Sequence, residues 1–302
     1  MESKPKVKEA VEWYSQNKAI YEALCRRVES IIKEVLDLEK INYYSVTSRA
    51  KSIESYRLKA SKGTYRDPRS EIMDMAGLRV ITYTDSDAKR VFELMKRTFD
   101  LCPTLSSDKT EELGVDKVGY RSFHCIATLG EGRLKLPENR LFSNTCFEIQ
   151  IRTILQHAWA EFEHDRNYKF KGLLPTNLRR RLSLIAGNLE SIDREFDNLS
   201  KEIDAYSTEV EQRTSKGDLA IPIDSVSLTA YLNEKFKDLV NEGIVNPDLV
   251  WGKATIEELS AMNVDSLKKL DDMIPKGFAE KARSFYLASL QRIGEQANFS
   301  SL

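Results

Sequence analysis

Polar side chains that could bind a ligand alternate with apolar ones in a segment that begins at Phe147. Over residues 147–152 the order is Phe147, Glu148, Ile149, Gln150, Ile151 and Arg152. This period of two is typical of a β-strand, and it places a carboxylate, an amide and a guanidinium on one face. Because the strand runs directly into a helix predicted at residues 153–164, we interpret this face as the wall of a pocket. An ordinary half-solvated strand is the alternative interpretation of this segment taken alone.

Two segments upstream place further polar groups next to predicted strands. Asp74 and Arg79 lie near the start of an apolar strand predicted at residues 77–83. The sequence Gly-Tyr-Arg-Ser-Phe-His at residues 119–124 leads into another strand, predicted at residues 123–129.

A cluster of basic and hydroxyl side chains precedes both segments and consists of Arg49, Lys51, Ser55 and Lys59. Ser52 is the expected N-cap of a helix that carries Ser55 and Lys59 one turn apart on the same face. Lysines and the free N–H groups of a helix N-terminus both bind phosphate. A solvated basic helix face is the alternative, since the chain has another run of arginines at residues 179–181.

These four elements in this order resemble the synthetase domain of the RelA/SpoT family, the enzymes that make the alarmones ppGpp and pppGpp. The motifs are Arg49-x-Lys51-x-x-x-Ser55-x-x-x-Lys59, DMAGLRV, GYRSFH and EIQIRTILQHAWAEFEH. No motif would suffice alone, but together they span roughly residues 20 to 170. The resemblance implies a nucleotidyltransferase-like fold of the DNA polymerase β type. It also implies an ATP-dependent pyrophosphokinase with GDP or GTP as the acceptor.

The resemblance assigns the catalytic and metal-binding roles to Asp74 and Glu148. Pyrophosphoryl transfer requires positioning and neutralisation of the phosphate charge, and Mg²⁺ prefers one or two carboxylates plus phosphate oxygens. We therefore expect Mg²⁺ as the cofactor, bound by these two side chains. Glu148 is also a candidate for deprotonating the attacking hydroxyl.

The resemblance also divides the remaining site residues between donor and acceptor. The expected ATP-binding residues are Arg49, Lys51, Ser55, Lys59 and Arg79. Arg49 and Arg79 would hold the adenine between their guanidinium planes. The expected acceptor-binding residues are Tyr120, Arg121, Gln150, Arg152 and His157. Tyr120 matches the tyrosine on which the guanine stacks, while a locally packed turn residue is its alternative role.

Two features bear on the subtype of the family. His164 and Asp165 spell the HD pair of metal phosphohydrolases, but the chain has three histidines and none lies in an upstream helical domain. We therefore expect a stand-alone small synthetase without a hydrolase half. The approach to Tyr120 contains Glu111, Glu112 and Asp116 where the family commonly has basic residues. This departure keeps open a toxic small synthetase that pyrophosphorylates the 3′-CCA end of tRNA. An inactive sensor of nucleotides or RNA is an alternative of another class, and the intact set Asp74, Glu148, Lys51, Lys59 and Tyr120 argues against it.

Composition agrees with a cytoplasmic protein. Among the 302 residues, 46 are Lys or Arg and 47 are Asp or Glu, a formal net charge of −1, so there is no global polyanion-binding signature. The four cysteines are scattered, with Cys125 and Cys146 expected inside strands as reduced, buried thiols. We expect no membrane span, since no apolar run is long enough, and no signal peptide, since residues 1–10 lack its apolar core.

The elements around these motifs predict an α+β fold, with a mixed sheet flanked by helices, then a long helix and a small all-α C-terminal region. The expected domains are a synthetase domain at 1–174, a heptad-patterned helix at 175–217 and a helical region of unknown role at 225–302. Apolar residues recur in steps of four and three over 176–213: Leu178, Leu182, Ile185, Leu189, Ile192, Phe196, Leu199, Ile203, Tyr206 and Val210. We expect this stripe to be covered partly by residues 225–302. The alternative is a homo-oligomer through the same helix.

Overall fold

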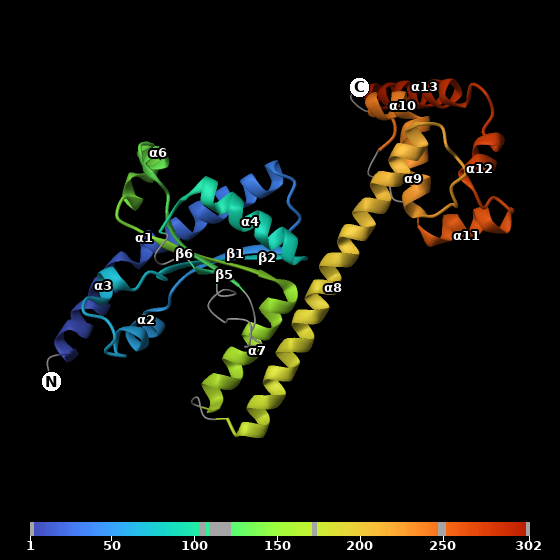
Figure 1. Cartoon of the computed structure of the whole chain (residues 1–302). Helices are drawn as coiled ribbons and strands as arrows, with labels where there is room; N and C mark the ends of the chain where they lie inside the picture. Colours follow the sequence, from blue (N-terminus) through green and yellow to red (C-terminus); the bar gives the residue numbers. More distant parts are fainter. Residues whose placement is uncertain (1–2, 103–106, 109–121, 171–173, 247–251, 300–302) are drawn as a thin grey trace. The chain divides into compact units, whose positions relative to one another are not determined.

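A computed structural model describes residues 3–102, 107–108, 122–170, 174–246 and 252–299 (Figure 1). The chain forms two compact units, residues 1–198 and 199–302, and each is described by itself. The division falls inside one long helix. The predicted domain boundaries at 174 and 225 therefore stay predictions.

The first unit is built on a mixed sheet, which has six strands within the described residues. These strands are β1 (Ser45–Ala50), β2 (Ala76–Thr82), β3 (Asp100–Leu101), β4 (Ser107–Asp108), β5 (Phe123–Thr128) and β6 (Phe147–Thr153). Their order is β1-β2-β6-β5-β3, with β4 paired to β5. Strands β2 and β6 pair in parallel at the centre, so both end at the same edge of the sheet.

Helices connect and flank these strands. In the first unit they are α1 (Ser3–Leu38), α2 (Ile53–Ala60), α3 (Pro68–Glu71), α4 (Asp85–Thr98), α6 (Glu131–Leu134), the 3₁₀ helix η1 (Pro137–Phe142) and α7 (Ile154–Phe170). The long helix α8 (Thr176–Ser215) crosses from the first unit into the second. The predicted α+β class with a mixed sheet, a long helix and a helical C-terminal region is confirmed.

One face of the sheet carries the hydrophobic core. The side chains of Leu78, Val80, Ile149 and Ile151 are at most 1% exposed, and α1 and α4 pack against the strands that carry them. The alternation that predicted strands β2 and β6 puts these apolar groups on the core side. Their polar neighbours therefore lie on the opposite face, where α7 follows β6 (Figure 1).

In the second unit, helices of 5 to 22 residues surround a small core. They are α9 (Ser225–Lys235), α10 (Lys237–Asn241), α11 (Lys253–Ala261), α12 (Leu267–Met273) and α13 (Phe278–Phe299). Ile221, Tyr231 and Leu267 are at most 2% exposed. The Tyr231 hydroxyl donates to Asp271 Oδ1 at 2.5 Å. Within the described part of the chain, no helix is long and apolar enough to cross a membrane.

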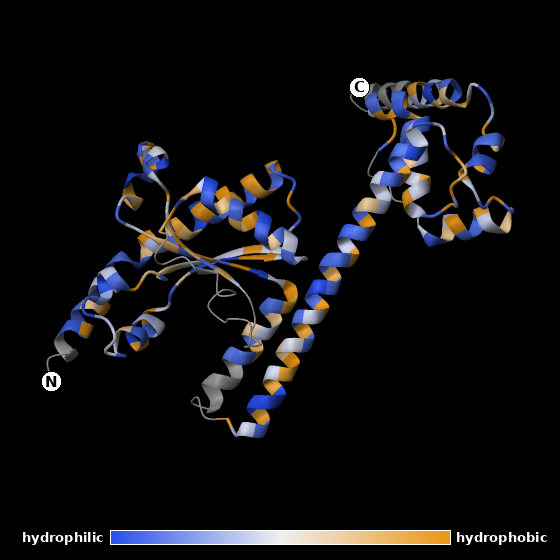
Figure 2. Cartoon of the chain, viewed as in Figure 1, coloured by the Kyte–Doolittle hydropathy of each residue, from blue (hydrophilic) through white to orange (hydrophobic). Residues whose placement is uncertain are grey.

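Apolar residues recur along α8 (Figure 2), and most of the predicted heptad stripe is exposed. Ile185, Ile192 and Phe196 are 44–49% exposed. Instead, Ala186, Asp193 and Asp197 are the buried positions of this half of the helix. The face of α8 that packs in the first unit is thus displaced from the apolar stripe.

An exposed apolar stripe of this length needs a cover, and our prediction that residues 225–302 supply part of it stays a prediction. Deleting residues 220–302 is expected to leave the stripe uncovered and the protein aggregated. Size-exclusion chromatography with light scattering measures the outcome. A truncated chain that is soluble and active, with the subunit count of the full chain, would instead place the stripe between subunits.

Candidate active site

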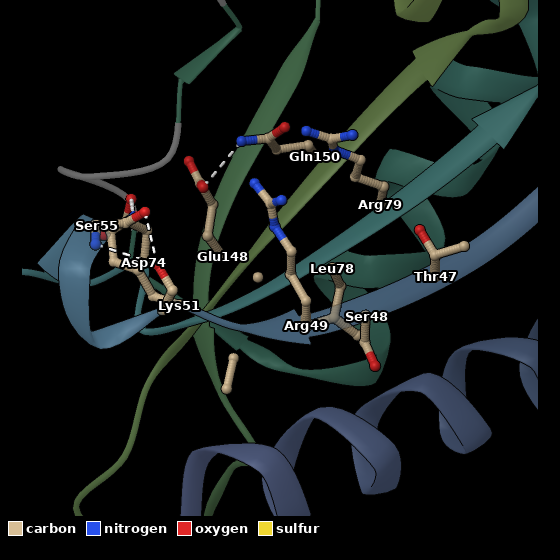
Figure 3. Close-up of a pocket in the computed structure, with 13 residues that line it drawn as sticks. Thr47, Ser48, Arg49, Lys51, Ser55, Asp74, Leu78, Arg79, Glu148 and Gln150 are labelled. Atoms are coloured by element: carbon tan, nitrogen blue, oxygen red, sulfur yellow. Dashed lines mark hydrogen bonds and ion pairs between the residues drawn. The ribbon is translucent and has the colours of Figure 1, made fainter. Parts of the chain in front are cut away.

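The polar face of the sheet brings the predicted site residues together because of its register. Arg49 of β1 lies opposite Gly77 of β2, which in turn lies opposite Glu148 of β6. A second row of paired residues lies two positions away on the same face. It crosses the sheet from β1 to β5 and consists of Thr47, Arg79, Gln150 and His124. Figure 3 shows Arg49, Arg79, Glu148 and Gln150 projecting to the same side.

These side chains line a cavity of about 400 Å³. Seven of the predicted residues contribute to its wall: Arg49, Lys51, Ser55, Asp74, Arg79, Glu148 and Gln150. Gly77 lies in the floor between Arg49 and Glu148. A Cβ atom there would meet only the Arg49 carbonyl oxygen, at 3.8 Å. The glycine therefore keeps the floor open rather than relieving backbone strain.

Asp74 sits between two lysines at one end of the cavity. Its Oδ2 atom is 2.7 Å from Lys51 Nζ and 2.9 Å from Lys59 Nζ. Burial alone would raise the pKa of Asp74, but the hydrogen bonds and charges of both lysines outweigh it and hold the pKa below its usual range. Asp74 is therefore ionised at neutral pH.

The turn that carries Lys51 is fixed from the core and from α2. The hydroxyl of the fully buried Tyr14 donates to the Lys51 carbonyl oxygen at 2.7 Å. Ser52 caps α2 as predicted, since its hydroxyl accepts from the Ser55 N–H at 3.1 Å. Helix α2 then brings Lys59 back to Asp74.

Glu148 is held by its neighbours on the polar face. His124 Nδ1 is 2.9 Å from Oε1 of Glu148, and Gln150 Nε2 donates to Oε2 at 3.0 Å. Burial would raise the pKa of Glu148, but the hydrogen bond and charge of His124, together with the Gln150 amide, lower it overall. Both carboxylates of the site are thus anionic and oriented.

The two carboxylates fit the expected Mg²⁺. Oδ1 of Asp74 is buried and has no hydrogen-bond partner among the described residues, so one oxygen is left to bind a cation. Within the same residues no cluster of three or more metal-binding side chains occurs. A site with two carboxylates, completed by phosphate oxygens and water, is the kind that Mg²⁺ prefers.

A second group of polar atoms lies where β6 passes into α7. Arg79 Nη1 is 2.7 Å from Glu161 Oε1, and His157 Nδ1 is 3.9 Å from the same oxygen, beyond hydrogen-bonding range. Arg152 Nε and His157 Nδ1 are buried without a hydrogen-bond partner in the described chain. Unpaired buried polar atoms are costly in a protein interior, so these two are candidates for contact with a substrate.

Burial and neighbouring charge also set the protonation of this group. Burial, followed by the charge of Arg79, lowers the pKa of Arg152. Burial lowers the pKa of His157, Glu161 opposes the shift, and Arg79 and Arg152 add to it. His157 is therefore neutral at pH 7 and can either donate or accept a hydrogen bond.

Two of the predicted site residues lie outside the described part of the chain, and two residues that were not predicted contact the site. Tyr120 and Arg121 lie outside the described residues. His124, the last residue of the GYRSFH motif, was not among the predicted site residues and contacts Glu148 directly. The contact between Glu161 and Arg79 was not predicted, although Glu161 lies one turn after His157 in the same motif. Cys146, expected inside a strand, instead precedes β6 and is half-buried.

Comparisons with known proteins identify relatives of this chain. A family model described as a region found in RelA / SpoT proteins matches residues 48–172. Two Bacillus subtilis (strain 168) proteins named GTP pyrophosphokinase are similar to this chain. YwaC is 31% identical over 163 residues, and this match covers 52% of this chain and 73% of YwaC. YjbM is 29% identical over 159 residues, and this match covers 52% of this chain and 72% of YjbM.

A solved structure is also similar to this chain. The crystal structure of small alarmone synthetase 2 from Bacillus subtilis is 26% identical with a TM-score of 0.53, and the match covers 63% of this chain and 98% of that protein's chain.

Proposed function

Because this chain belongs to the RelA/SpoT family, we propose that it transfers a pyrophosphoryl group from ATP to the 3′-hydroxyl of GDP or GTP. The observation that carries the proposal is the meeting of Asp74, with its two lysines, and Glu148 in one cavity. The names of YwaC and YjbM support the same reaction class.

The donor binds at the end of the cavity formed by β1, α2 and Asp74. Lys51 and Lys59 meet the phosphates of ATP by charge, and the N-terminus of α2 beside Ser55 offers backbone N–H groups. Arg49 and Arg79 face the adenine, since a guanidinium plane stacks well on an aromatic ring. Asp74 pairs with Lys51 and Lys59, and Glu161 pairs with Arg79, so these carboxylates compensate the charge of three of the four cations.

Mg²⁺ held by Asp74 and Glu148 would neutralise the phosphate charge that builds up during transfer. The 3′-oxygen of the acceptor attacks the β-phosphorus of ATP, the bond from that phosphorus to the bridging α,β-oxygen breaks, and AMP leaves. The hydroxyl proton must pass to a base. Of the two carboxylates in the cavity we assign this role to Glu148, whose lowered pKa makes it a weak base that is ionised at neutral pH.

The acceptor binds on the α7 side of Glu148. Gln150, Arg152 and His157 supply polar groups there, and the two buried nitrogens without partners, Arg152 Nε and His157 Nδ1, support this placement. From the sequence, Tyr120 supplies the stacking surface for guanine and Arg121 a further contact. In this division the ATP phosphates lie at the Asp74 end of the cavity, and Arg79 borders the acceptor groups because it lies opposite Gln150.

The adenine nucleotide that is released tests the reaction class. Purified protein with ATP, Mg²⁺ and GDP should form AMP in a one-to-one ratio with a guanosine tetraphosphate, measured by anion-exchange chromatography. Formation of ADP in place of AMP would contradict the proposal, because it indicates transfer or hydrolysis of a single phosphate.

A further inference from the structure

Two aspartates of α8 are buried at the sheet edge where the parallel strands β2 and β6 both end. Asp193 is 5% exposed and Asp197 is 9% exposed. Asp193 Oδ2 accepts hydrogen bonds from Thr153 Oγ1 at 2.9 Å and Gln156 Nε2 at 3.2 Å, at the start of α7. Asp197 Oδ1 accepts from the Ser86 N–H at 2.9 Å, in the first turn of α4. One turn of α8 thus places a carboxylate at the N-terminus of each helix that follows a central strand, where negative charge is favoured.

At α7 the carboxylate completes a capping box. The Thr153 N–H donates to Gln156 Oε1 at 3.0 Å, and the Gln156 N–H donates to Thr153 Oγ1 at 3.2 Å. A threonine hydroxyl has one hydrogen, and this hydrogen points to Asp193. Asp193 therefore orients the hydroxyl so that its lone pair faces the Gln156 N–H. It also fixes the amide orientation of Gln156 by accepting from Nε2.

Burying the Asp193 carboxylate at this junction lowers the stability of the folded state. Burial raises the pKa of Asp193 to about 6, with Asp85 and Asp197 adding to the shift. Its Oδ1 atom has no hydrogen-bond partner among the described residues. An apolar residue at position 193 would avoid the cost of burying a charge. Helix α8 has apolar residues on its exposed stripe, but not at this buried position. A carboxylate at this junction therefore calls for a role beyond packing.

The junction lies between the two halves of the site. Strand β6 carries Glu148, Gln150 and Arg152 before Thr153, and α7 carries His157 directly after Gln156. One turn further, Glu161 pairs with Arg79 in the cavity wall. The direction in which α7 leaves β6 thus decides where His157 and Glu161 stand relative to Glu148.

We propose that Asp193 is a positioning residue for pyrophosphoryl transfer, which acts through the Thr153–Gln156 capping box on His157 and Glu161. The inference rests on the proposed function for its kinetic consequence, but its structural consequence can be measured without activity. Asp197 offers a matched control, since it binds the first turn of α4, and no residue of α4 lines the cavity.

Steady-state kinetics with ATP and GDP on the full chain provide the first test. Asp193→Ala is expected to lower kcat/KM at least tenfold, and Asp197→Ala to change it less than threefold. Asp193→Asn should restore most of the loss, because its amide oxygen can accept both hydrogen bonds. If Asp193→Ala fails to fold, Asp193→Leu fills the site with an apolar group and should show the same loss. Wild-type kcat/KM in the Ala or Leu variant, or an equal loss in Asp197→Ala, would overturn the proposal.

Amide hydrogen exchange provides the activity-independent test. The Thr153 and Gln156 amides should exchange faster in Asp193→Ala than in wild type, and at the wild-type rate in Asp193→Asn. Unchanged exchange in Asp193→Ala overturns the positioning role whether or not the protein is a transferase. An inactive wild type whose Asp193→Ala variant exchanges faster would overturn the proposed function and leave the capping role of Asp193 standing.

The charge of Asp193 adds a pH dependence that a purely apolar contact would lack. The charged groups around it are Asp85 of α4, paired with Lys89 at 2.8 Å, and Asp197 on its own helix. Because the folded state holds the Asp193 proton more tightly than the unfolded state, stability present below pH 4 is lost as the pH rises towards about 6. Asp193→Asn should therefore melt at a higher temperature than wild type at pH 7.5, with a smaller difference at pH 5. An equal difference at both pH values would contradict the raised pKa.

Discussion

Asp74→Asn and Glu148→Gln are each expected to abolish pyrophosphoryl transfer while leaving the fold intact. Each substitution removes a charge that faces the cavity and keeps the size of the side chain. The loss of one such group should cost about 3 kcal/mol or more of transition-state stabilisation, roughly a hundredfold in rate. In Asp74→Asn, Lys51 and Lys59 also lose the carboxylate between them.

Single-turnover kinetics and circular dichroism separate chemistry from folding in these two variants. Glu93→Gln is a suitable control, because this carboxylate lies on α4 and pairs with Lys96 away from the cavity. Near-wild-type turnover in Asp74→Asn or Glu148→Gln would remove that residue from the catalytic pair.

Lys59→Ala should weaken ATP binding with every acceptor. The lysine is 2.9 Å from Asp74 and would meet the donor phosphates, so its removal strips charge from the donor side alone. Hydrogen bonds to charged groups contribute about 1.5–3 kcal/mol, which corresponds to a rise in the KM for ATP of roughly tenfold to a hundredfold. Lys62→Ala, an exposed lysine just after the same helix, is the matched control.

Tyr120→Ala provides the counterpart on the acceptor side. Loss of a stacking surface should cost about 1–3 kcal/mol, by analogy with base stacking in nucleic-acid grooves. The KM for GDP or GTP should rise while the KM for ATP is unchanged. If Tyr120→Ala raised the KM for ATP and left the KM for GDP or GTP unchanged, the assignment of the donor and acceptor subsites would be wrong.

The sequence was informative where periodicity and motif agree. The alternation at residues 147–152 predicted β6 and its polar face, and the motif order predicted seven residues that line one cavity. Strand β1 was not predicted, because Val46 is its one buried residue and the strand forms by pairing with β2 at the edge of the sheet. Strands β3 and β4 have two residues each, too few for a periodic signal.

The packing of α8 shows a different limit. Its heptad pattern predicted the helix, whose observed bounds are Thr176–Ser215. The pattern did not predict that Asp193 and Asp197 would be buried in place of the apolar stripe. Their docking depends on the N-termini of α4 and α7, which are distant in sequence and leave no trace in the period of α8. The contacts of His124 with Glu148 and of Glu161 with Arg79 could not be predicted either, because each joins residues that only the folded sheet brings together.

The choice of acceptor tests the central claim most directly. The protein should be incubated with ATP labelled in its γ-phosphate, with Mg²⁺, and with GDP, GTP or bulk tRNA in parallel reactions. The account predicts label in the guanosine tetra- or pentaphosphate, at a rate that Glu148→Gln abolishes. Label that enters tRNA and leaves GDP and GTP unlabelled would contradict it and assign the site to the 3′ end of tRNA.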